Sequence, residues 1–202
     1  MWITHVPYDV ADGRLKQLYD RVKGPGDNVD NIMLAHSLRP HSMEGHMTLY
    51  KNVLHHAANQ LPKWFLETLG VYTSGLNGCA YCVDHHTAGL RRLLADDART
   101  VAISSALEHE LFGTVFDVAQ IAALHYTRTL TLAAHDQALL LKNVVSMRAA
   151  GLDDGCVLEI NQVVAYFNYA NRTVLGLGVT TTGDVLGLSP NSAEDPGDWS
   201  HR

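Results

Sequence analysis

The chain has 202 residues, of which 47% are hydrophobic and 18% charged, so it holds enough apolar side chains for a sizeable globular core. Its formal net charge is −6 without long runs of one sign, whereas a nucleic-acid-binding surface needs a basic stripe. The apolar stretches are too short to span a bilayer, and the first residues lack the basic start and apolar run of a secretory signal. Three cysteines make no disulfide framework. We therefore expect a cytoplasmic protein with neither a nucleic-acid nor a membrane partner.

Helical periodicity dominates the first half of the chain, and no convincing alternating strand pattern is present. Apolar side chains on one stripe predict a first helix that stops at a Lys-Gly-Pro-Gly breaker run. Pro62 suits the first turn of a later helix, because the N–H group that proline lacks would be unpaired there. The predicted helices are Ala11–Val22, Asn31–Leu38 (ending before Pro40), Ser42–Ala58, Pro62–Gly75 and Cys79–Leu94.

The second half of the chain shows the same helical periodicity. Asp136 and Asp153 or Asp154 suit helix N-caps, and Gly151 suits a left-handed C-terminal cap. The predicted helices are Ala98–Leu111, Val115–Thr129, Asp136–Ala150 and Asp154–Leu175. The fold class is therefore an all-α, multi-helix bundle of a single domain.

Three segments divide this bundle. We expect an N-terminal helical extension over residues 1–39, the main helical domain over residues 40–179 and a C-terminal tail over residues 180–202. The tail is rich in Gly, Ser, Pro, Asp and Asn, which is typical of a loosely held segment. Leu186 and Leu188 are its candidates for apolar contact with the rest of the protein.

One short stretch carries the sharpest chemical signal. It reads Cys79-Ala-Tyr-Cys82-Val-Asp-His-His86, and Glu67 lies twelve positions before its first cysteine. Two of the three cysteines of the chain fall in this stretch, so chance clustering is a poor explanation. The motif indicates thiol chemistry.

The helix that the motif begins gives its side chains a common face. Unpaired N–H groups in the first helical turn favour a thiolate over a thiol, and Cys79 lies at this position. Cys82 follows one turn later, close enough to form a disulfide with Cys79. His86 comes four residues after Cys82 on the same stripe, with His85 as a nearby alternative. Glu67 must arrive from the preceding helix, which has to cross this one at an angle.

If these groups meet, they can reduce a hydroperoxide. A thiolate at Cys82 attacks the terminal oxygen and becomes a sulfenic acid. His86, oriented by Glu67, supplies a proton to the departing oxygen. Cys79 then forms a disulfide with Cys82, which another dithiol must reduce. This cycle needs no flavin, haem or metal cofactor.

These residues resemble the alkylhydroperoxidase D-like (AhpD-like) branch of the carboxymuconolactone decarboxylase family, whose Glu-x11-Cys-x2-Cys-x3-His signature they match at each named position. Residues 70–78 are similar to the segment before its cysteines, and residues 165–172 to the final helix of the peroxidase-related protein group. The resemblance implies an all-helical fold that forms homo-oligomers. It also implies an enzyme, a thiol-dependent peroxidase or disulfide reductase, whose electrons come from a partner dithiol, in some members a lipoyl group.

The resemblance also implies a role for each matched residue. Cys82 corresponds to the cysteine that attacks peroxide and Cys79 to the resolving cysteine, while Glu67 and His86 correspond to the proton relay. The best-known members have histidine directly before the second cysteine, where this chain has Tyr81. A phenol has an unperturbed pKa of about 10 and does not shuttle protons near neutrality as imidazole does. Tyr81 and His85 are therefore auxiliary candidates.

Two alternatives remain open for the motif. The cysteine pair, His86 or His85 and Glu67 could hold a structural zinc ion in an interaction module, although such sites usually lie on knuckles and short loops. A decarboxylase-like lyase on the same scaffold would not need the cysteine pair.

The histidines and the cysteine outside the motif are expected to have structural and not catalytic roles. The histidine pairs His55–His56 and His41 with His46 show no ligand spacing and are expected at the surface or in caps. Cys156 is expected to be a small core or helix-start residue.

Overall fold

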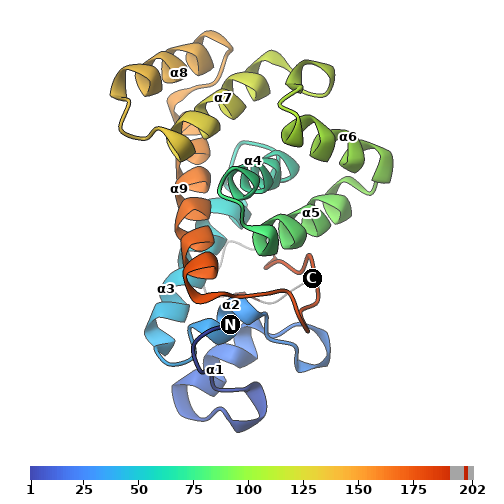
Figure 1. The fold of residues 1–202 in the computed structure, drawn as a ribbon, viewed down its shortest axis with the longest axis vertical. Coiled ribbons are helices and arrows are strands. Elements are labelled where there is room, and N and C mark those ends of the chain that lie inside the picture. The colour runs from blue at the N-terminus through green and yellow to red at the C-terminus, as the bar shows by residue number, and fades with distance from the viewer. Residues whose placement is uncertain (192–197, 200–202) are drawn as a thin grey trace.

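The computed structural model describes residues 1–191, 198 and 199, and within them the chain is built of helices (Figure 1). This confirms the predicted all-α class. Short 3-10 turns join several of the helices, and one π-helical turn covers Lys51–His55. The α-helices are α1 (Gly13–Val22), α2 (Asn31–Ala35), α3 (Pro40–Tyr50), α4 (Lys63–Leu76), α5 (Ala80–Leu94), α6 (Asp97–Glu108), α7 (Val118–Leu132), α8 (Gln137–Ala149) and α9 (Asp154–Leu177). No helix in these residues is both long enough and apolar enough to cross a membrane.

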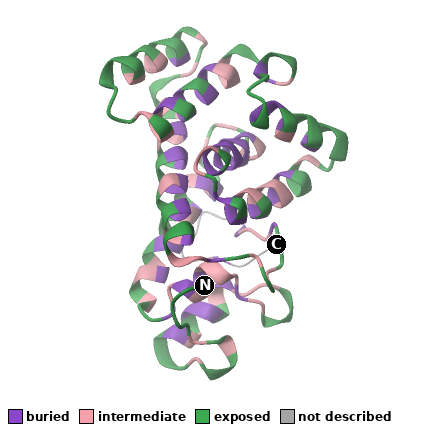
Figure 2. Cartoon of the chain, in the orientation of Figure 1, coloured by how far each residue is buried: buried purple, intermediate pink, exposed green. Residues whose placement is uncertain are grey.

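Helix α4 is the centre of the molecule. It packs against α5, α6, α7 and α9, and Figure 2 shows it almost uniformly buried at the middle of the fold. Its buried face includes Glu67, a carboxylate that is 1% exposed among apolar neighbours. A carboxylate is rarely buried in this way without a polar partner, so the neighbouring elements must supply one.

A tight turn joins α4 to α5 and sets how the two helices lie against each other. Gly78 has φ of +68°, a left-handed conformation that suits glycine. Cys79 follows as the N-cap residue of α5. The side-chain amide of Asn77 donates hydrogen bonds of 3.1 and 2.9 Å to Asn168 and Asn171 of α9, which fixes the turn against the long helix.

Helix α9 runs the length of the bundle (Figure 1). Its first turn is capped by the side chain of Asp153, and it ends at Gly178 in the left-handed conformation. Gly70 of α4 lets α9 approach closely, because a Cβ there would lie 2.2 Å from the ring of Phe167. That ring is therefore held at a fixed depth in the core, where it borders the site described below.

The sequence misplaced some helix ends. Pro40 was expected to follow a helix but instead begins α3, where its missing N–H costs nothing. The expected helix over residues 42–58 is wrong in its second half, since α3 ends at Tyr50 and the π-helical turn follows. His55, the last residue of this π-helical turn, is buried in the core.

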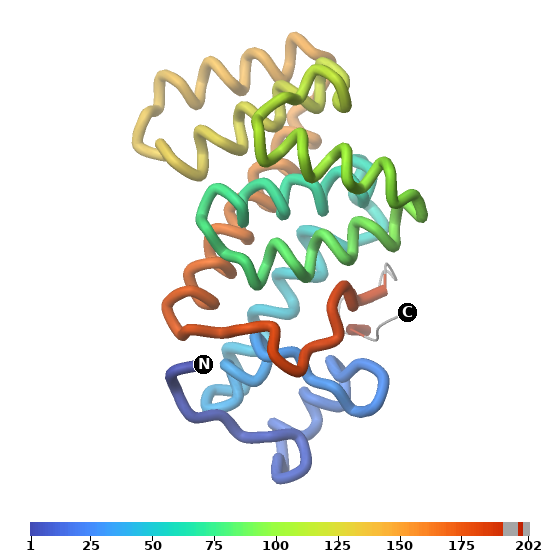
Figure 3. The backbone as a smooth tube through the Cα atoms, turned by 45° about the vertical axis from the view of Figure 1, so that its right-hand side comes forward, coloured from blue at the N-terminus to red at the C-terminus, as the bar shows by residue number. Residues whose placement is uncertain are grey.

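The chain termini close the lower end of the bundle. Helices α1, α2 and α3 enclose a second apolar core that includes Leu18, Tyr19 and Met43. The C-terminal segment, which is the part of the tail over residues 180–191, passes between this layer and α5, as Figures 1 and 3 both show. Side chains from both neighbours hold it there, so the expectation of a loosely held tail is wrong for these residues.

Candidate active site

A small cavity lies where α3, α4, α5, α9 and the C-terminal segment converge. Its volume is about 60 Å³. Helix α4 contributes Glu67 to the wall, and α5 contributes Cys82, His86 and the auxiliary candidates Tyr81 and His85. Three of the four residues of the sequence motif therefore face one cavity. The fourth, Cys79, lies directly behind Cys82 and is fully buried.

The two sulfurs of the motif are in contact. Cys79 Sγ lies 3.2 Å from Cys82 Sγ, and both thiols are free. Cys79 at the N-cap and Cys82 one turn into α5 produce this contact through the helix geometry alone. A disulfide bond is about 2.05 Å long, so the sulfurs need to approach by roughly 1 Å to form one.

The contact also shifts the pKa values of the two thiols in opposite directions. The hydrogen bond with Cys82 lowers the pKa of the Cys79 thiol to about 7, against the opposing effect of burial. The same hydrogen bond, followed by burial, raises the pKa of Cys82. The side chain of Asn171 in α9 makes a smaller contribution that lowers the pKa of both thiols. The pair therefore loses one proton near neutral pH and keeps the other, with the negative charge in a contact between two sulfurs.

Glu67 reaches the site as an acid–imidazole pair with His86. His86 Nδ1 lies 2.7 Å from Glu67 Oε2. Because Nδ1 is engaged with the carboxylate, Nε2 is the ring nitrogen left for proton exchange in the cavity. Gly89 of α5 also lies beside the Glu67 carboxylate, which is 3.9 Å from the position a Cβ of this residue would take.

Aromatic rings hold His86 in place. Phe167 makes an edge contact with its ring at 4.6 Å between centroids, and Tyr50 makes a second at 6.1 Å. Tyr50 is stacked on Tyr166 at 5.4 Å. Burial, as the main cause, raises the pKa of both tyrosines well above its usual value, so both phenols stay protonated. The rings therefore form a neutral wall around the acid–imidazole pair.

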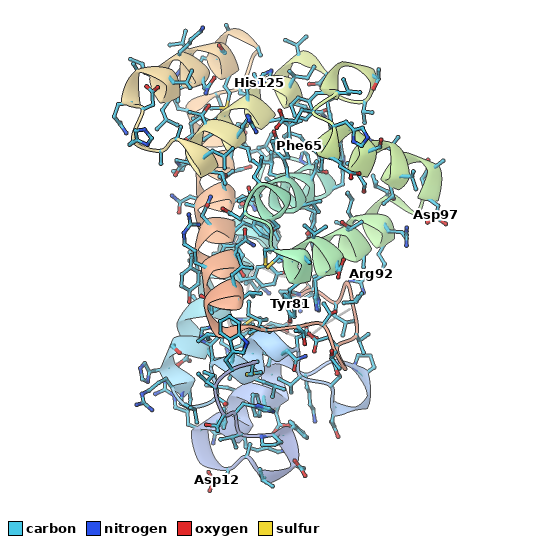
Figure 4. All side chains as sticks on the ribbon, in the orientation of Figure 1. Asp12, Phe65, Tyr81, Arg92, Asp97 and His125 are labelled. Carbon is cyan, nitrogen blue, oxygen red and sulfur yellow. The ribbon has the colours of Figure 1, made fainter. Side chains whose placement is uncertain are left out.

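The auxiliary candidates also line the cavity, but they contact a different carboxylate, that of Asp184 in the C-terminal segment. Tyr81 donates a 2.8 Å hydrogen bond to Asp184 Oδ2, and His85 Nε2 lies 3.1 Å from the same oxygen. Burial, reinforced by the Asp184 charge, raises the pKa of Tyr81 far above its usual value. The structure thus brings His86 to Glu67 and directs His85 to Asp184. In Figure 4, Tyr81 lies on the side of α5 that faces the C-terminal segment.

Sequence reasoning missed several residues of the site. His55 was expected at the surface, but it is buried and its Nε2 lies 3.9 Å from Glu67 Oε1. His46 was also expected at the surface and is buried, 5.6 Å from the ring of Tyr166, where burial lowers its pKa to about 3. His41 is exposed, as expected. No signal in the sequence marked Asp184, which reaches α5 from a segment without periodicity.

The donor atoms around the motif do not converge on a single point. Within the described part of the chain, no group of three or more His, Cys, Asp or Glu side chains is arranged to hold a metal ion. His86 turns its ring to Glu67, and His85 turns to Asp184. The zinc alternative therefore finds no support in this geometry.

Comparison with known proteins shows which solved structures share the fold of this chain. No family model and no curated protein matches the sequence. A structure described as an alkylhydroperoxidase AhpD core, an uncharacterized peroxidase-related protein from Ralstonia eutropha JMP134, matches with a TM-score of 0.75 and 20% identity over 89% of this chain and 91% of that one. An uncharacterized peroxidase-related protein from Silicibacter sp. TM1040 matches with a TM-score of 0.71 and 20% identity over 88% of this chain and 91% of that one.

A third structure is a protein of unknown function from Agrobacterium tumefaciens, described as a candidate antioxidant defence protein AhpD. It matches with a TM-score of 0.61 and 20% identity over 72% of this chain and 93% of that one. The chain therefore has the AhpD-like all-helical fold, which confirms the resemblance at the level of the fold.

Proposed function

We propose that the chain is a member of the AhpD-like group and an enzyme, a thiol-dependent peroxidase and disulfide oxidoreductase that reduces hydroperoxides. The observation that carries this is the 3.2 Å contact between Cys79 and Cys82, with Cys82 facing a cavity that also holds the Glu67–His86 pair. The AhpD-like fold and the peroxidase-related descriptions of its structural neighbours support the same activity.

The first step is attack on the peroxide. Cys82 is the attacking residue because it lines the cavity, whereas Cys79 lies behind it. Cys79 has the lower pKa, so its thiolate accepts the Cys82 proton across the 3.2 Å contact before attack. The Cys82 thiolate then bonds to the terminal oxygen, the O–O bond breaks, and Cys82 becomes a sulfenic acid. The departing alkoxide, or hydroxide, takes a proton from the His86–Glu67 pair and leaves as alcohol or water.

The second step forms the disulfide. The sulfur of Cys79 attacks the sulfenic sulfur of Cys82, and the hydroxide that leaves takes the Cys79 proton to become water. The two sulfurs are already in contact, so little movement is needed. Cys79 is at the N-cap and not inside the helix, which leaves its backbone free to make that movement. An external dithiol then reduces the disulfide and is itself oxidised.

Tyr81 takes no part in this relay. Its pKa is raised by burial, and its hydroxyl is committed to Asp184. The relay therefore consists of Glu67 and His86, and the residue in the place of the usual histidine has a structural role.

Peroxide oxidation of the purified, reduced chain tests the activity directly. One equivalent of hydrogen peroxide should lower the intact mass by about 2 Da as Cys79 and Cys82 lose two hydrogens. Cys156→Ser should behave like the wild type, since Cys156 lies outside the cavity. Cys82→Ser should abolish peroxide consumption, and Cys79→Ser should stop at a sulfenic acid that dimedone traps.

Two results would overturn the assignment. In the first, peroxide leaves both motif thiols free in the folded chain. In the second, Cys82→Ser consumes peroxide in the presence of a dithiol as fast as the wild type; activity on a lactone substrate retained without both cysteines would then favour the lyase. A dihydrolipoyl compound and a dithiol protein are the reductants to compare. The cycle requires a reducing compartment, which is consistent with a cytoplasmic location. Light scattering on the purified protein tests whether it forms the expected homo-oligomer.

A further inference from the structure

The C-terminal segment forms one wall of the cavity. Gly187, Leu188, Ser189 and Pro190 line it together with Cys82 and His86. Figure 3 shows the segment crossing the face of α5 on its way from the end of α9. Access to Cys82 therefore depends on residues far from it in the sequence.

Asp184 fastens one end of this wall. Its side chain is 2% exposed and accepts hydrogen bonds from Tyr81 at 2.8 Å and from the backbone N–H of Asn31 at 3.0 Å. His85 Nε2 adds a third contact at 3.1 Å. A buried carboxylate with several hydrogen-bond donors is a strong anchor, because loss of these bonds would leave a charge without partners.

Further contacts hold the rest of the segment. The side-chain amide of Asn31 donates hydrogen bonds of 2.8 and 2.9 Å to the carbonyl groups of Thr180 and Thr182. At the other end, Lys51 donates a 3.2 Å hydrogen bond to the side chain of Asn191. The segment is thus fixed at both ends, by polar contacts and not by a large apolar face.

Gly187 brings the middle of the segment onto the backbone of α5. A Cβ at Gly187 would lie 2.8 Å from the carbonyl carbon of Ala88 and 2.9 Å from the backbone nitrogen of Gly89. Backbone atoms cannot move aside as the end of a side chain can, so only glycine allows this approach. Gly183 offers a contrast, because it also has positive φ but has no atom near the position of a Cβ.

We propose that residues 184–190 form a lid over Cys82, that Asp184 is its fastening residue, and that the closed lid restricts the enzyme to small hydroperoxides. A single water needs roughly 10–15 Å³ in a cavity, so about 60 Å³ holds only a few non-hydrogen atoms. Hydrogen peroxide and short alkyl hydroperoxides fit this space, whereas a bulky aryl or fatty hydroperoxide needs the lid to open. The substrate restriction rests on the proposed peroxidase activity, but the control of access to Cys82 does not.

Alkylation of Cys82 in the reduced, folded chain tests the lid independently of catalysis. Each variant is treated with iodoacetamide, a small reagent, and with fluorescein maleimide, a bulky one, and the labelled cysteines are quantified by peptide mass spectrometry. Cys156 serves as the internal reference in every sample because it lies outside the cavity. In the wild type, we expect the bulky reagent to label Cys82 much more slowly than Cys156.

Asp184→Ala should raise the rate of maleimide labelling at Cys82 about tenfold, the change expected when hydrogen bonds to a charged anchor are lost. Gly187→Ala should act in the same direction, and Gly183→Ala, which carries the same backbone strain without the clash, should not. Asp184→Asn and Asn31→Ala are gentler variants, in case the others fail to fold. Equal maleimide labelling of Cys82 in the wild type and in every folded variant would overturn the lid.

A second experiment measures peroxidase activity and compares kcat/KM for cumene hydroperoxide with kcat/KM for hydrogen peroxide. We expect this ratio to rise about tenfold in Asp184→Ala, in step with the labelling rate. A labelling change in a chain without any peroxidase activity leaves the lid standing and removes the proposed function. A labelling change with an unaltered substrate ratio in an active enzyme overturns the substrate restriction.

Discussion

Two neighbouring histidines of α5 meet carboxylates from very different parts of the chain. His86 pairs with Glu67, 19 residues away on the helix before it, and His85 pairs with Asp184, 99 residues away in the C-terminal segment. The first pair lies between two helices whose packing is part of the main core. The second depends on hydrogen bonds that hold a segment without regular structure. Both histidines line the cavity, but we expect Glu67–His86 to be the rigid pair and His85–Asp184 the movable pair, which opens with the proposed lid.

This difference matters because stability is not uniform within a fold. Regions with few apolar contacts and many hydrogen bonds to loops open at lower free energy than the core. We expect the Glu67–His86 pair to stay assembled when the proposed lid opens, so that it is in place whenever substrate or reductant reaches Cys82. In the proposed cycle a dithiol must also reach the disulfide, and opening of the lid would give that second reactant its route.

The largest expected effect comes from the rigid pair. Glu67→Gln and His86→Gln should each lower kcat/KM for hydrogen peroxide by about 100-fold, since a positioned acid–base group contributes a factor of this order. The double variant should be little worse than either single variant, because the two residues act as one unit. The measurement is steady-state peroxide consumption with excess dithiol. Glu44→Gln, an exposed carboxylate that pairs with Arg14, is the matched control.

The histidine of the movable pair should behave differently. His85→Ala removes one contact of Asp184, so we expect maleimide labelling of Cys82 to rise about fivefold. Its effect on hydrogen peroxide turnover should be much smaller than that of His86→Gln. If His85→Ala instead lowers turnover as strongly as His86→Gln, then both histidines serve the relay, and the division into a rigid and a movable pair is wrong.

One half of the rigid pair was predictable from local rules, because helical spacing places His86 on the stripe of Cys82. The other half, Glu67, was proposed from the resemblance, since the sequence permits the crossing of the two helices but does not require it. The cysteine contact follows from the same spacing. Most helices were also predictable, since their apolar periodicity is long and clear.

The movable pair was not predictable, for a physical reason. Asp184 lies in a segment whose position is set by hydrogen bonds to Asn31 and Tyr81, and no local pattern encodes such long-range contacts. His55 was missed for a different reason. It is the last residue of the π-helical turn, and a prediction of one continuous helix over residues 42–58 does not show where the side chains of that turn lie.

The acidity of the cysteine pair gives a pH test that does not depend on peroxide. The pKa of Cys79 is lowered to about 7, and the thiolate is the reactive form, so alkylation should rise as pH increases through about 7 and then level off. In Cys82→Ala the hydrogen bond that lowers this pKa is absent. The midpoint for Cys79 should therefore move to higher pH. Iodoacetamide rates, resolved by cysteine, supply the measurement, and an unchanged midpoint in the variant would contradict the shared-proton description.

Substitution of Tyr81 should give the smallest effect, and it best separates a role in the lid from a role in the proton relay. Its hydroxyl accepts from the backbone N–H of Ile32 at 3.2 Å and donates to Asp184, so Tyr81→Phe removes two hydrogen bonds. We expect a loss of about 1 kcal/mol in the free energy of unfolding and about a twofold rise in maleimide labelling of Cys82.

Tyr126→Phe is the matched control for this substitution. Tyr126 is similarly buried and accepts a 2.7 Å hydrogen bond from Asn161, far along the bundle from the lid. Its loss should cost similar stability without changing the labelling of Cys82, as thermal unfolding and peptide mapping would measure. A fall in hydrogen peroxide turnover as large as that of His86→Gln in the Tyr81 variant would instead place the phenol in the proton relay. Because burial holds that phenol protonated at neutral pH, we expect its effect on access to the cavity to exceed its effect on turnover.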